Sequence, residues 1–82
     1  MEKMNEEIFG QLREIMVDEL GIDGAQIKPE SVLLSDLDIN SLELMNLVMV
    51  VEEKYNIFID EERLHDIKTV GDVVSYIVEL KG

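Results

Sequence analysis

The stretch NSLELMNLVMVVEEKY, residues 40–55, decides the fold of this chain. Its apolar residues recur at the three- and four-residue spacing of an amphipathic helix. Asn40 and Glu43 have the spacing of a capping box, in which each side chain satisfies a backbone N–H of the other residue. The pattern predicts a helix that begins at Ser41 and ends at residue 54 or 55, with a core face formed by Leu44, Leu47, Val48, Val51 and Tyr55.

Apolar residues at helical spacing also predict a first helix over residues 5–20. Asn5 is a suitable N-cap for this helix, and Gly21 follows its last apolar residue as a stop signal. Its expected apolar face consists of Ile8, Leu12, Ile15, Met16 and Leu20, with Phe9 beside them.

The last part of the chain predicts one short and one longer helix. Asp60 is the expected cap of a short helix that reaches about His65. Thr69, with Asp72 three residues further on, is the expected cap of the last helix. The apolar face of that helix is expected to comprise Val70, Val73, Val74, Ile77, Val78 and Leu80.

Residues 21–40 contain glycine, proline, serine and several acids, so we expect a connection and not a helix. A loop of this length is unusual in a compact domain and is often functional. We expect it to be pinned across the helix ends by its own apolar residues, namely Ile27, Val32, Leu33, Leu34 and Leu37.

The composition favours a small helical domain. Hydrophobic residues make up 46% of the 82 residues, aromatic residues only 5%, and Trp is absent, so the core must consist of Ile, Leu, Val and Met. We expect a single all-α domain over residues 1–82. Its predicted architecture is a small four-helix bundle, three main helices plus one short helix, with a long loop between helices 1 and 2.

The strong acidity of the chain limits its partners. The formal net charge of −12 repels the phosphate backbone of nucleic acids and the surface of anionic membranes. No apolar run approaches the about 20 residues of a spanning helix, and no signal-peptide pattern opens the chain. We expect a cytoplasmic monomer that binds neither nucleic acid nor membrane and meets proteins with basic patches.

The sequence offers little for catalysis or metal binding. It has no Cys, one His and no glycine-rich phosphate loop, and we interpret His65 as a solvated or packing residue. Residues 36–40 have the alternating acids that open an EF-hand loop. However, Ser41 and Leu47 occupy the positions where that loop needs Gly and a bidentate acid. We therefore expect a protein that is not an enzyme and holds no metal.

Ser41 allows two interpretations. It is either an ordinary polar residue at a helix start, or the carrier of a phosphate-bearing group. If Asn40 caps the helix, the Ser41 hydroxyl is left free at the first helical position. A phosphodiester there would lie at the positive end of the helix dipole, beside unpaired N–H groups.

The helix over residues 41–55 has more apolar surface than one core face requires. Met45 and Met49 fall on or near its outer side, one turn apart and close to Glu52. They are either gap-filling core residues or part of an exposed, adaptable strip, flanked by acids, that docks several partners in turn.

Taken together, these features resemble the acyl carrier protein family over nearly the whole chain. The typical motif around the modified serine of that family is Gly-x-Asp-Ser-Leu, and Ser41-Leu42 align with its end. The pattern continues with the acidic pair Glu52-Glu53, the acidic run 60–62 and Thr69-Val70 before the last helix.

The resemblance implies a function and a cofactor. A phosphopantetheinyl transferase would transfer a 4′-phosphopantetheine arm from coenzyme A to Ser41. Acyl or aminoacyl cargo would then be attached to the thiol of the arm as a thioester. Partners would be that transferase, an acyl- or aminoacyl-loading enzyme, and synthases or transferases with basic docking patches. The residues expected to contact partners are Glu43, Met45, Met49, Glu52 and Glu53.

Two positions depart from the family motif. Asp38 stands where Gly is usual, and Asn40 stands where Asp is usual. Asn46 and Lys54 also reduce the acidity of the expected docking helix. These changes favour a carrier for a dedicated pathway over a housekeeping fatty-acid role. Two alternatives remain open at this point: an aminoacyl or peptidyl carrier, and an unmodified acidic docking module.

Overall fold

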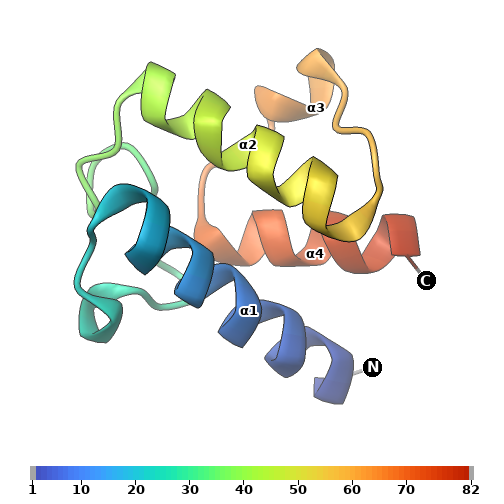
Figure 1. Ribbon diagram of the computed structural model, residues 1–82, viewed down its shortest axis with the longest axis horizontal. Helices are drawn as coiled ribbons and strands as arrows, with labels where there is room; N and C mark the ends of the chain where they lie inside the picture. The colour runs from blue at the N-terminus through green and yellow to red at the C-terminus, as the bar shows by residue number, and fades with distance from the viewer. Residues whose placement is uncertain (1, 82) are drawn as a thin grey trace.

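The computed structural model describes residues 2–81, with side chains from residue 5 to residue 81. Figure 1 shows the helices in chain order, α1 (Glu2–Leu20), the 3-10 turn η1 (Gly24–Gln26), α2 (Ser41–Tyr55), α3 (Glu61–Leu64) and α4 (Val70–Lys81). α1 packs against both α2 and α4. The prediction of an all-α bundle with three main helices and one short helix is confirmed.

The start of α1 differs from the prediction. The helix begins at Glu2, three residues before the predicted cap, and Asn5 lies inside it, so the assignment of Asn5 as N-cap is wrong. The residues before Asn5 include Glu and Lys. Their long unbranched side chains lose little conformational entropy in a helix, so the helix can begin before Asn5. The other end is as expected, because Gly21 adopts a positive φ of 67° and its N–H bonds the carbonyl of Val17.

The core lies between α1, α2 and α4. Its most deeply buried side chains come from these helices and the loop, and they are Leu12, Met16, Leu33, Leu47, Val51, Val70 and Ile77. Each fully buried Leu, Ile or Met contributes about 1.5–3 kcal/mol relative to an exposed one, so this cluster is the main source of stability. At the edge of the core, the Tyr55 hydroxyl donates to Oε1 of Gln11 and ties α2 to α1, and burial raises the pKa of that hydroxyl.

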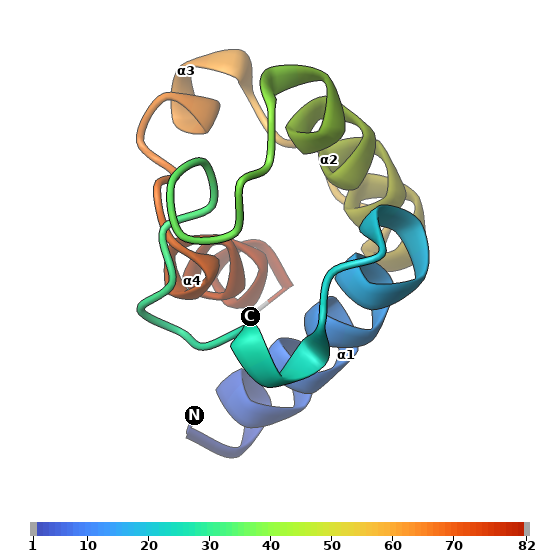
Figure 2. The same cartoon turned by 90° about the vertical axis from the view of Figure 1, so that its left-hand side faces the viewer.

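The loop between α1 and α2 is held in place by hydrogen bonds. It crosses one end of the helices and meets the start of α4, as Figure 2 shows. The N–H of Leu33 donates to the Lys68 carbonyl at 2.9 Å, and the N–H of Val70 donates to the Ser31 carbonyl at 3.0 Å. The N–H of Gly71 reaches the Pro29 carbonyl at 2.7 Å, an approach that a β-carbon at Gly71 would obstruct.

Two apolar residues lie where they were not expected. Leu34 was predicted to pin the loop, but it is exposed, because Leu33 and Leu37 take the buried positions on either side of the turn. Leu80 was predicted to belong to the inward face of α4, but it is exposed in the last turn, past the end of the core cluster. The other apolar residues predicted for the loop and for α4 are buried or half-buried.

The cap of α4 is the predicted pair. The Asp72 N–H donates to the Thr69 hydroxyl at 3.1 Å, and the Asp72 carboxylate accepts from the N–H groups of Lys68 and Thr69. These backbone hydrogen bonds lower the pKa of Asp72. The cap fixes the segment between α3 and α4 against the loop, and this segment forms one wall of the site described next.

Candidate functional site

The site begins at the N-terminus of α2. Asn40 has extended backbone angles, with φ −86° and ψ 173°, and its side chain accepts from the Glu43 N–H at 2.8 Å. The Glu43 carboxylate accepts in return from the Asn40 N–H at 3.1 Å. The predicted capping box is therefore present, and α2 begins at Ser41 as predicted.

Because Asn40 caps α2, the Ser41 hydroxyl is not needed as a helix cap. The residue is exposed at the first helical position, and within residues 5–81 its hydroxyl forms no hydrogen bond. In the same part of the chain, the N–H groups of Ser41 and Leu42 also have no acceptor. A phosphate attached to the hydroxyl would therefore lie near two free donors and the positive end of a fifteen-residue helix.

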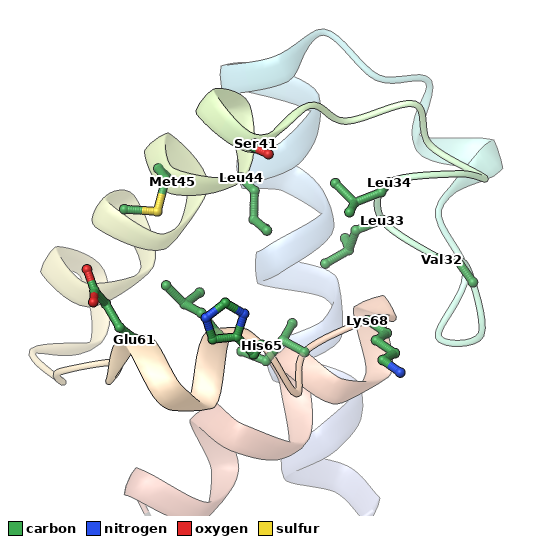
Figure 3. Close-up of a pocket in the computed structure, with 11 residues that line it drawn as sticks. Val32, Leu33, Leu34, Ser41, Leu44, Met45, Glu61, His65 and Lys68 are labelled. Carbon is green, nitrogen blue, oxygen red and sulfur yellow. The ribbon is translucent and has the colours of Figure 1, made fainter.

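A cavity of about 670 Å³ opens beside Ser41, within the size range of small-molecule sites. Figure 3 shows Ser41 and Leu44 on one side of it and the α3 segment with His65 on the other. The full lining comprises Val32, Leu33, Leu34, Ser41, Leu44, Met45, Glu61, Leu64, His65, Ile67 and Lys68. Most of these side chains are aliphatic, so the cavity suits an apolar guest that also reaches the Ser41 oxygen.

The sequence pattern did not show which residues line this cavity. His65, interpreted as a solvated or packing residue, is exposed and also lines the cavity. Leu34, expected to pin the loop, lines it too. The cavity exists because the loop over residues 32–34 and the segment over residues 61–68 come together. No local sequence signal carries that information.

The outer face of α2 exposes apolar side chains. Met45 is 45% exposed and Met49 is 61% exposed, and Leu42 is also exposed. Of the acids expected to contact partners, Glu53 is exposed and forms no hydrogen bond within residues 5–81. Glu52 is half-buried, and its carboxylate accepts from the Ile59 N–H at 2.8 Å, so it also holds the segment that follows α2.

The exposure of Phe58 was not predicted from the sequence. It is 76% exposed between α2 and α3, while its neighbours Ile57 and Ile59 are at least half-buried.

Within the described residues, no group of His, Cys, Asp and Glu side chains could hold a metal ion. In the same part of the chain, no helix is long and apolar enough to cross a membrane.

Comparison with known proteins gives the family. Residues 10–77 match the family described as "Phosphopantetheine attachment site". The chain belongs to the acyl carrier protein family. An acyl carrier protein from Picosynechococcus sp. is 43% identical over 96% of this chain and 98% of its own length. One from Thermotoga maritima is 42% identical over 94% of this chain and 95% of its own length.

The fold is also that of a solved acyl carrier protein. A crystal structure of an acyl carrier protein from Thermotoga maritima superposes with a TM-score of 0.84 and covers 94% of this chain and 89% of that chain. The identity to it is 21%, so this likeness concerns the fold alone.

Membership defines the chemistry that the chain takes part in. It is a non-enzymatic carrier, and its cofactor is a covalently attached 4′-phosphopantetheine. The N-terminus of α2 fits such a group, because it combines an unbonded exposed hydroxyl, free backbone donors and an adjoining cavity. The resemblance found in the sequence is confirmed at the level of the family.

The backbone angle of Asp38 shows why Gly suits this position of the family motif and why Asp is tolerated there. Its φ is 54°, in the left-handed region, where Gly is unstrained and other residues are strained. Asp is among the side chains that tolerate this region best, which allows the departure.

We predict that Asp38→Gly stabilises the protein by about 0.5–1 kcal/mol, because relief of backbone strain outweighs the added freedom of the unfolded chain. Urea unfolding of both proteins measures the difference. Asp38→Asn is the matched control, because it removes the same charge but keeps a β-carbon. If Asp38→Asn gives the full gain, charge and not backbone strain limits stability here.

Proposed function

We propose that Ser41 is the attachment point of the 4′-phosphopantetheine arm, and that the chain carries acyl groups between enzymes of fatty-acid, polyketide or related biosynthesis. The observation that carries the proposal is the Asn40–Glu43 capping box, which leaves the Ser41 hydroxyl free at the start of α2. The other exposed serines of the described chain, Ser35 and Ser75, do not lie at the N-terminus of a long helix and do not line this cavity.

The chain supplies the oxygen but not the catalysis for its own modification. In the proposed step the Ser41 oxygen forms a bond to the phosphorus on the pantetheine side of the coenzyme A diphosphate. The bond from that phosphorus to the oxygen of the adenosine bisphosphate half breaks, and the hydroxyl proton is lost. Within residues 5–81 no base is hydrogen-bonded to the Ser41 hydroxyl, so we expect the modifying transferase to supply the base that takes the proton.

Once in place, the arm supplies a terminal thiol that holds cargo as a thioester. The chain itself has no Cys, so that thiol has no internal partner for a disulfide. The aliphatic lining of the cavity, including Leu33, Leu44, Leu64 and Ile67, supports acyl over aminoacyl cargo. An aminoacyl cargo carries an ammonium group that would lose hydration beside these residues without gaining a partner.

The proposal also includes a docking face on the outside of α2. Met45 and Met49 offer flexible apolar surface, and Glu43, Glu52 and Glu53 provide negative charge at the same helix. This arrangement suits a phosphopantetheinyl transferase, a loading enzyme and synthases with basic patches, which would bind in turn. We further propose that the chain acts as a single-domain monomer in the cytoplasm, where its high negative charge opposes self-association.

The attachment is tested by intact mass. Incubation with coenzyme A and a promiscuous phosphopantetheinyl transferase should add one phosphopantetheine to the wild-type chain and none to Ser41→Ala. Ser35→Ala, which removes an exposed loop hydroxyl, should be modified like the wild type. An unmodified wild type would support an unmodified docking module, and a modified Ser41→Ala would place the arm elsewhere. Either result contradicts the proposal.

The docking face is tested by affinity for the transferase. Met49→Ala should raise the Kd about fivefold, a typical loss for one contact residue of about 1 kcal/mol, while Glu53→Lys should weaken binding more at low salt. Val17→Ala and Glu14→Lys are matched controls, since both residues are exposed on α1. Glu53 is used in place of Glu52 because Glu52 also holds the Ile59 N–H. Equal affinities for the α1 and α2 variants would contradict a docking role for α2.

A further inference from the structure

The polar groups of the cavity beside Ser41 are distributed unevenly. The side of α2 and the loop contributes Ser41 and otherwise only apolar side chains. The cavity has three ionisable lining residues, and all of them come from α3 and the segment that follows it: Glu61, His65 and Lys68. The cavity therefore has one apolar wall and one wall that contains charged or titratable groups.

These three residues are placed differently. Figure 3 shows the Lys68 side chain at one edge, directed away from the cavity, and Glu61 at the opposite edge. The His65 imidazole lies between them, across the cavity from Ser41 and Leu44. Of the three, His65 is therefore the one that a guest in the middle of the cavity would meet.

His65 also has hydrogen-bonding capacity to spare. Within residues 5–81 its ring nitrogens form no hydrogen bond, and the residue is exposed at the end of α3. A neutral imidazole offers one donor and one acceptor. A polar group of the guest that entered an all-apolar cavity would lose its hydration without compensation, and His65 removes that cost for one such group.

We propose that His65 is a specificity-determining residue of this carrier, and that it favours acyl chains bearing a hydroxyl or keto oxygen over saturated chains of the same length. The inference rests on the proposed function, because it requires cargo attached through Ser41. The aliphatic residues Leu44 and Leu64 would contact the hydrocarbon part of either cargo, while His65 would hydrogen-bond the oxygen of the first kind alone.

The chain provides its own reporter for the test, because His65 is its one histidine. Untagged protein would be prepared with the bare arm, with an octanoyl group and with a 3-hydroxyoctanoyl group, and loading would be verified by intact mass. Imidazole proton and carbon signals, and nuclear Overhauser contacts from the imidazole and from the Leu44 methyls to the cargo, would then be recorded by NMR for each form.

We expect imidazole contacts to the 3-hydroxyoctanoyl cargo that are about fivefold stronger than those to octanoyl, a ratio set by a net hydrogen bond of about 1 kcal/mol. His65→Leu should weaken the Leu44 contacts of the 3-hydroxyoctanoyl cargo and leave those of octanoyl unchanged. His65→Gln, which keeps a donor and an acceptor, should restore part of the preference.

Three results would overturn the inference. They are no imidazole contact to either cargo, equal contacts to both, or changes in the imidazole proton and carbon signals that already appear in full with the bare arm. Failure to load at all is a different result, visible in the mass before any NMR, and it would contradict the proposed attachment at Ser41. Because His65 is exposed, its variants should fold, and the amide spectrum of each checks this.

Discussion

The capping box between Asn40 and Glu43 is the interaction on which the site depends. It ends the long loop, starts α2 and satisfies two backbone N–H groups with two side chains. Ser is itself a good N-cap, so without Asn40 the neighbouring Ser41 would be the natural residue to cap the helix. The box assigns the capping role to Asn40 and leaves Ser41 one position inside, with a hydroxyl that the fold does not use.

The rest of the structure places a cavity beside that hydroxyl. The loop is fixed to the start of α4 by backbone hydrogen bonds from Leu33, Val70 and Gly71, and the Thr69–Asp72 cap holds the same region. These contacts set the loop over residues 32–34 opposite the segment over residues 61–68, with α2 beside both. The same hydrogen bonds and caps that stabilise the helix ends therefore also shape the cavity beside Ser41.

Most of the fold could be predicted from local pattern. The capping pairs at Asn40 and Thr69 and the apolar spacing of the three main helices are short-range signals, and the structure follows them. The first helix begins three residues before the predicted cap at Asn5, because the residues that precede Asn5 are good helix formers. Leu34 and Leu80 were assigned to the core because hydrophobicity alone does not show where a turn points or where the core ends.

The candidate site was only half predictable. The proposal of Ser41 follows from the cap and from the family pattern, whereas the cavity and the place of His65 depend on segments that are distant in sequence. The structure also shows that Glu43 and Glu52, expected on the docking face, each hold a backbone N–H. Charge pattern alone does not separate acids that bind partners from acids that hold the fold.

The role of Asn40 is measured directly by the rate at which a transferase modifies Ser41, followed by intact mass. In Asn40→Ala, Ser41 should become the cap of a helix that starts one residue later, and modification should slow about fivefold, in line with a cap of about 1 kcal/mol. Asn40→Ser, which keeps a capping side chain and the same charge, should be modified at close to the wild-type rate. Modification of Asn40→Ala at the wild-type rate would contradict the claim that this cap makes Ser41 available.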